Sequence, residues 1–101
     1  MIHVIARALI KEGCMEEYLK ICKEITPTVR AEEGCIAYQI TTDRKTGMPP
    51  QSYDANCATF VECWESEEHL KKHLQAPHMA VFREKVTPLR ISSTLTITED
   101  A

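Results

Sequence analysis

Residues 61–78 read VECWESEEHLKKHLQAPH, and they carry more structural information than any other part of the 101-residue chain. An apolar strand ends at Trp64, Ser66 stands where a helix N-cap is expected, and two acidic residues follow in the first helical turn. The segment therefore predicts a strand that turns into a short helix lying across the face of its sheet. Trp64 and His73 fall on either side of this corner and could line one pocket.

Length, composition and charge restrict the class of protein. A chain of 101 residues with 44% hydrophobic and 27% charged side chains is typical of one globular domain, residues 1–101. The net charge of −3 is spread over interspersed acids and bases, so the basic patch of a nucleic-acid-binding protein is missing. No apolar run approaches the ~20 residues that cross a bilayer, and the N-terminus does not resemble a secretion signal. We expect a cytoplasmic protein without a nucleic-acid or membrane partner.

The five cysteines include no Cys-x-x-Cys pair. Zinc sites use closely spaced ligand pairs, so we expect no metal, and a cytoplasmic chain is not expected to form disulfides. Most of the cysteines are interpreted as small buried apolar residues. Cys57, which the pattern places in a loop, is the one candidate for a reactive thiol.

Hydrophobic periodicity predicts the order strand, helix, strand, strand, helix, strand. The predicted strands cover residues 2–10, 36–40, 58–64 and 89–98; helices start at Met15, at about Glu67 and at His78. The first strand is apolar throughout and is expected to be a central strand covered on both faces. Pro27 should bend the first helix or end it early. This order is the ferredoxin-like βαββαβ fold of class α+β, a four-stranded antiparallel sheet with its helices on one face, and residues 42–57 form a long loop.

The helices can cover only one side of this sheet. The other side mixes apolar and polar side chains: His3, Ile5, Arg7 and Leu9 on the first strand, and Thr59, Val61 and Cys63 on the third. Such a surface suits a subunit interface, and packing across a two-fold axis would bury it. We expect a homodimer formed through the sheet face; the alternative is a monomer with a semi-polar exposed sheet.

The candidate site residues gather around the 61–78 corner. His73 shares a helix face with two leucines and should point inward, either as a hydrogen-bonded core residue or as a base that accepts a phenolic proton. Trp64 is either core or a pocket wall that stacks on a flat substrate. Glu62 has the strand parity of Phe60 and should face the helices, where it either pairs with a buried basic group or has a pKa raised by burial.

Four further residues are secondary candidates. Tyr38 is expected to be a core aromatic residue whose hydroxyl could reach the cavity. Met79 and Phe82 are expected in the core. His78 starts a helix, where capping, a surface contact and a ligand contact are all open.

Three segments resemble the antibiotic biosynthesis monooxygenase family, in particular its quinol monooxygenase-like members. They are residues 31–38 (AEEGCIAY), 62–66 (ECWES) and 73–78 (HLQAPH). The resemblance covers nearly the whole chain. It implies a dimeric α/β barrel of ferredoxin-like subunits, each with a pocket between helices and sheet. It also implies oxidation of a quinol or small phenolic compound by molecular oxygen, without metal, haem or flavin. Haem-degrading relatives carry other residue types where this chain has Ala6, His73 and Arg83.

With this resemblance we expect His73, Trp64 and Glu62 as catalytic residues, and Tyr38, Phe60, His78, Met79 and Phe82 as substrate-binding residues. Two other functions stay open. One is isomerisation of a small polar metabolite, with or without a phosphate group, although the sequence shows no glycine-rich loop or Arg/Lys cluster for phosphate. The other is non-catalytic binding of a small ligand by the dimer.

Overall fold

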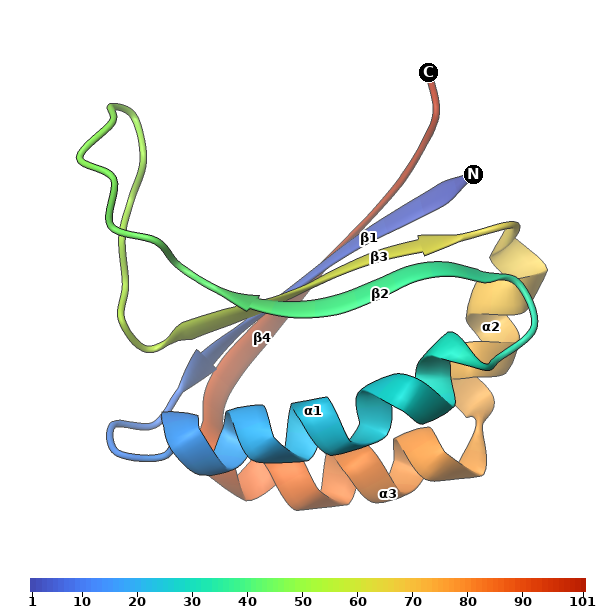
Figure 1. Ribbon diagram of the computed structural model, residues 1–101, viewed down its shortest axis with the longest axis horizontal. Helices are drawn as coiled ribbons and strands as arrows, with labels where there is room; N and C mark the ends of the chain where they lie inside the picture. The colour runs from blue at the N-terminus through green and yellow to red at the C-terminus, as the bar shows by residue number, and fades with distance from the viewer.

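The computed structural model describes residues 1–101 and has the predicted ferredoxin-like order of elements (Figure 1). The elements are β1 (Ile2–Ile10), α1 (Met15–Arg30), β2 (Cys35–Thr42), β3 (Cys57–Trp64), α2 (Glu67–Gln75), α3 (Pro77–Val86), the 3-10 turn η1 (Thr87–Leu89) and β4 (Arg90–Glu99). All neighbouring strands are antiparallel in the order β2-β3-β1-β4. None of the helices has the length and apolar character needed to cross a membrane.

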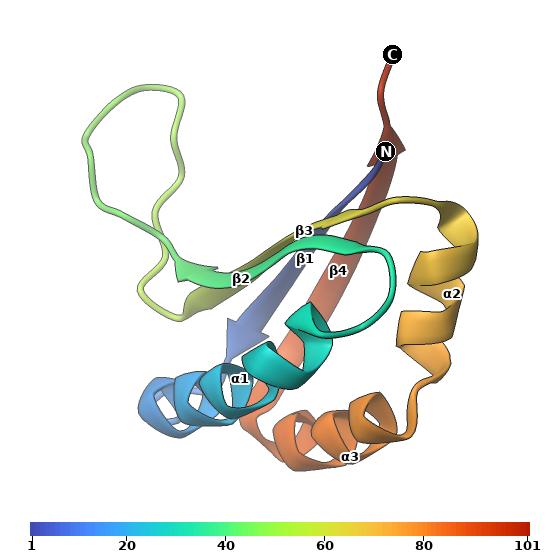
Figure 2. The ribbon, with the colours of Figure 1, turned by 45° about the vertical axis from the view of Figure 1, so that its right-hand side comes forward.

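The helices lie on one face of the sheet, as Figures 1 and 2 show. On β1 the side chains of Val4, Ala8 and Ile10 point to this face and are buried, whereas Ile5 on the opposite face is 41% exposed. β1 is an interior strand, as predicted, but the expectation that both of its faces are covered is wrong for the single chain. No helix of the chain packs on the second face, which we name the open face.

Pro27 was expected to bend helix α1 or end it early; the helix continues to Arg30, so the early end is wrong. Proline removes one backbone donor, but the carbonyl of Pro27 still accepts from the amide of Ala31 at 3.2 Å. The Thr26 hydroxyl also donates to the carbonyl of Cys22 at 2.8 Å. Packing of the buried stripe around Tyr18, Cys22 and Val29 outweighs the free-energy cost of the backbone hydrogen bond that Pro27 cannot donate.

Strand β2 departs from simple alternation at its start. Its register with β3 shifts between Cys35 and Ala37. Ile36 is therefore 51% exposed, whereas Tyr38 is buried in the core. Simple alternation over the predicted strand 36–40 would put Ile36, Tyr38 and Ile40 on one apolar face. This is wrong at Ile36, because a bulge moves its side chain out of the two-residue repeat.

The corner between β3 and α2 forms as predicted. The Ser66 side chain caps α2 by accepting from the amide of His69 at 3.2 Å. The turn after α1 packs against this corner: the Gly34 carbonyl accepts from the Glu65 amide at 2.9 Å. Gly34 has φ +81°, and an added Cβ would lie 2.2 Å from Cγ of His69. The close approach brings the α1–β2 turn against α2.

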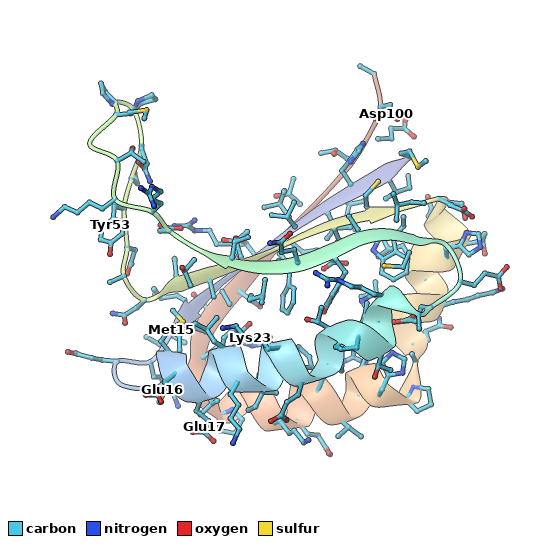
Figure 3. The ribbon with its side chains drawn as sticks, in the orientation of Figure 1. Met15, Glu16, Glu17, Lys23, Tyr53 and Asp100 are labelled. Atoms are coloured by element: carbon cyan, nitrogen blue, oxygen red, sulfur yellow. The ribbon has the colours of Figure 1, made fainter.

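The 43–56 loop extends away from the sheet, and Figure 3 labels Tyr53 on the arm that returns toward β3. Its base is attached to β1 because Arg7 donates to both carboxylate oxygens of Asp43, at 3.3 and 3.2 Å. Cys57 is the first residue of β3 and is buried, not in the loop as predicted. Burial raises the pKa of its thiol, which opposes the reactivity considered for it.

Candidate functional site

A cavity of about 270 Å³ lies between the helix layer and the sheet. Most of its lining is apolar. The strands contribute Val4, Ala6, Arg7, Ala8, Tyr38, Phe60, Glu62, Arg90, Ser93, Thr94, Leu95 and Ile97, and the helices contribute Tyr18, Leu70, His73, Leu74, Met79, Phe82 and Arg83. A space of this kind, with few polar groups in an apolar wall, is the usual form of a small-molecule site.

Two ionisable side chains face each other on one wall. Glu62 on β3 is 7% exposed and His73 on α2 is 1% exposed. The distance from Glu62 Oε1 to His73 Nε2 is 3.9 Å, beyond a direct hydrogen bond but within reach of a small side-chain movement. Glu62 points toward the helices because of its position in the alternation of β3. His73 points toward the sheet because it lies on the same face of α2 as the leucines. Both orientations were predicted from the sequence.

Trp64 supports this pair from behind. It is fully buried and is not part of the cavity lining. Its indole N–H donates to Glu62 Oε1 at 3.0 Å, and its ring packs on the His73 imidazole with centroids 4.5 Å apart. The structure thus places Trp64 beside both site groups but away from the space a substrate would occupy, so stacking on a substrate is not available to it in this arrangement.

A carboxylate that the sequence reasoning missed holds His73 on its outer side. Glu32, in the turn after α1, has its Oε2 atom 2.8 Å from His73 Nδ1 and 3.0 Å from His78 Nε2. With Nδ1 carrying the proton donated to Glu32, Nε2 of neutral His73 has its lone pair on the side of the cavity. His78 lies outside the cavity lining, with its side chain 30% exposed. Its observed contact is with Glu32, and a contact with a ligand stays a prediction.

Glu32, His73 and His78 also form a donor set that could hold a metal ion, since their ligand atoms all lie within 4.8 Å of one another. Two imidazoles and one carboxylate are a common ligand combination. Hydrogen bonds at 2.8 and 3.0 Å already account for these contacts. We therefore describe the three residues as a hydrogen-bonded chain from the buried His73 ring to the surface.

The ionisation behaviour of the pair follows from burial. Removal from water raises the pKa of Glu62 from 4.5 to about 7, and the Trp64 hydrogen bond only partly offsets this change. Burial lowers the pKa of His73, against the opposing effect of Glu32. Near neutral pH the site therefore contains a neutral imidazole beside a carboxyl group that can gain or lose a proton.

Aromatic side chains form the wall next to the ionisable pair. The rings of Tyr38 and Phe60 lie 4.8 Å apart, those of Phe60 and Phe82 6.0 Å apart, and Tyr38 meets His73 edge-on at 5.6 Å. Tyr38, Phe60, Met79 and Phe82 all line the cavity, where the sequence placed them. Tyr18 lines it too and was missed as a site residue; its place on the buried stripe of α1 was the available signal.

The fold and this cavity define a class of protein, the ferredoxin-like domains with a small-molecule site between helices and sheet. The sequence matches the antibiotic biosynthesis monooxygenase family over residues 1–85, and the chain belongs to that family.

One relative supports the family by its sequence, and two solved structures share the fold. The chain is 37% identical over 76 residues to the Escherichia coli K12 protein named probable quinol monooxygenase YgiN. The aligned residues are 75% of this chain and 69% of that protein. A conserved protein from Methanosarcina mazei Go1 has the same fold, with a TM-score of 0.87 and 21% identity over 99% of this chain and 92% of the other. A structure described as an antibiotic biosynthesis monooxygenase has a TM-score of 0.84 at 22% identity, covering 100% and 99% of the two chains.

Proposed function

We propose that this protein is a monooxygenase that oxidises a quinol or small phenolic compound with molecular oxygen, without a metal, haem or flavin cofactor. The observation that carries the proposal is the facing of Glu62 and His73 across 3.9 Å in a cavity with apolar and aromatic walls. Family membership and the name of the Escherichia coli relative support the same reaction class.

The chemistry needs little from the protein besides a place to bind and a proton acceptor. A free phenol has a pKa of ~10, and its anion donates electrons to oxygen far more readily than the neutral ring. Glu62, whose pKa is raised to about 7, can take the hydroxyl proton near neutral pH. One oxygen atom then becomes a ring hydroxyl, the other leaves as water, and the quinol becomes a hydroxyquinone.

The proton has a route away from the cavity. A small movement brings Glu62 into hydrogen-bond distance of His73 Nε2, and His73 Nδ1 already faces Glu32 at 2.8 Å. Glu32 in turn contacts His78, which reaches the surface. Trp64 acts as a positioning residue, since its N–H holds the Glu62 carboxyl without touching the cavity.

We also propose that two copies of the chain form a dimer through the open face in the cytoplasm. The apolar side chains Ile5 and Val61 are 41% and 43% exposed there and lie directly opposite each other on β1 and β3. Neighbouring polar groups such as Thr96, paired with Ile5, would complete a mixed interface.

The reaction is tested by oxygen uptake with a panel of hydroquinones, measured above the rate without protein. With ¹⁸O₂ the hydroxyquinone product should gain one heavy oxygen atom. Glu62→Gln and His73→Ala should bind the substrate but turn it over ~10²–10⁴-fold more slowly, as loss of a general base predicts. Glu84→Gln, at an exposed residue of α3 outside the cavity lining, is the matched control and should keep full activity.

Two outcomes would contradict the proposal. One is oxygen uptake no faster than the spontaneous oxidation of the quinol. The other is a product that lacks the heavy atom, formed with hydrogen peroxide, which would indicate a simple oxidase.

A further inference from the structure

Positive charge gathers around the cavity, although the chain as a whole has a net charge of −3. Three arginines are part of the lining, Arg7, Arg83 and Arg90, against the single acidic residue Glu62. These arginines form no cluster in the sequence, because they come from β1, α3 and β4 and meet only in the folded chain. A positively charged site on a protein with a negative net charge favours anionic ligands.

Arg7 is already neutralised within the subunit. Its guanidinium makes two contacts with the Asp43 carboxylate, at 3.3 and 3.2 Å. A paired fork of this kind satisfies the geometry and the charge of the arginine. Arg7 therefore has little left to offer a ligand.

Arg83 and Arg90 have no such partner. Arg83 donates from Nη2 to the backbone carbonyl of Leu74 at 3.1 Å, which leaves its charge uncompensated. No carboxylate oxygen lies within 4.0 Å of either guanidinium, while the other ion pairs of the molecule involve different residues. Two arginines that line one apolar cavity thus lack a carboxylate partner.

Both arginines act on the interior of the cavity. The charge of Arg83 contributes to lowering the pKa of His73, and the charge of Arg90 acts to lower that of Tyr18, against the larger effect of burial. Both affected groups line the cavity. Ser93, three residues beyond Arg90 on β4, adds a hydroxyl donor to the same lining.

We infer that the substrate is a hydroxylated aromatic compound with an anionic substituent, which Arg83 and Arg90 bind while the ring lies in the cavity with its hydroxyl at Glu62 and His73. This inference rests on the proposed function for the reacting end of the molecule. The anion site itself depends only on the two arginines and the apolar lining. A carboxylate on the ring is the simplest group of this class, since a guanidinium can bind it through two parallel hydrogen bonds.

The experiment compares an acid with its neutral ester. Binding of 1,4-dihydroxy-2-naphthoic acid and of its methyl ester is measured by calorimetry under anaerobic conditions, so that no turnover is needed. We expect the acid to bind at least tenfold more tightly than the ester, as charge-assisted hydrogen bonds predict. Arg83→Gln and Arg90→Gln should each remove most of that preference and leave the affinity for the ester unchanged.

Lys85→Gln is the matched control, because it removes one positive charge from α3 at a residue outside the cavity lining. It should leave the preference for the acid intact, and Arg83→Lys should retain part of it. Equal binding of acid and ester by the unaltered protein would overturn the inference, as would an acid preference that survives both arginine substitutions. Binding of the acid without oxygen uptake would contradict the proposed monooxygenase and leave the anion site standing.

Discussion

Glu62 connects the stability of the molecule with its proposed chemistry, because the same burial that raises its pKa makes its ionisation costly to the fold. The unfolded carboxyl ionises near pH 4.5, whereas the folded one ionises at about 7. Between these values the folded state holds a proton that the unfolded state has lost. This group therefore makes the protein less stable as the pH rises through that window.

Glu62→Gln should remove this effect. Near pH 4 the two proteins have similar free energies of unfolding, since glutamine and protonated glutamate are alike in size and hydrogen bonding. At pH 8 the variant should be more stable by up to ~3 kcal/mol, the equivalent of a pKa difference of about 2.5 units. Urea unfolding of both proteins at the two pH values measures the difference, and equal stabilities at pH 8 would contradict the raised pKa.

The site was predictable where neighbours along one element decide it. Strand parity put Glu62, Phe60 and Trp64 on the helix-facing side, and helical spacing pointed His73 inward. Glu32 was not predictable, because it lies in a turn whose packing against α2 no local pattern describes. For the same reason the sequence left capping, a surface contact and a ligand contact open for His78, whose observed partner is Glu32.

Among the elements, the turn between α1 and β2 determines where Glu32 lies. Gly34 has a positive φ and is packed against His69 so closely that an added Cβ would meet the ring. Gly13 has a similar φ of +83° but no atom within 4 Å of the same position. Comparing alanine substitutions at the two glycines therefore distinguishes the cost of backbone strain from the cost of a steric clash.

Gly34→Ala should destabilise the protein by ~2–3 kcal/mol or more, and Gly13→Ala by only ~1 kcal/mol. The alanine at position 13 costs backbone strain alone, whereas the one at position 34 must also displace the corner that Ser66 caps. Thermal or urea unfolding of the two variants gives the comparison. Equal losses at both glycines would show that the contact with His69 has no energetic consequence.

Secondary structure could be predicted for most of the chain, because its strands and helices have clear apolar periods. The prediction failed where a tertiary effect acts against a local rule. Pro27 is tolerated inside α1 because the helix is buried along one stripe. Ile36 leaves the expected face because a register shift at the start of β2 interrupts the alternation.

For the whole molecule, the open face is the side of the sheet that no helix covers. Val61→Arg should disrupt the proposed dimer, since it places a charge at an apolar position of the interface. Sedimentation of the variant should show monomers at concentrations where the unaltered protein is a dimer. Val81→Arg, at a residue on α3 that is 50% exposed, is the control and should sediment like the unaltered protein.

A monomeric unaltered protein would contradict the proposed assembly. Persistence of the dimer in the Val61→Arg variant would place the interface elsewhere. Neither result would alter the cavity, which lies on the opposite side of the sheet from Val61.

Strand β4 forms one side of the cavity while it borders only β1, with nothing beyond it in the subunit. Leu95 and Ile97 point toward the cavity and are still more than half exposed. A ligand in the cavity would cover these side chains and stabilise β4 against local opening. Ligand binding and the pairing of β4 with β1 would thus stabilise each other, so that a bound ligand would reduce the opening of β4.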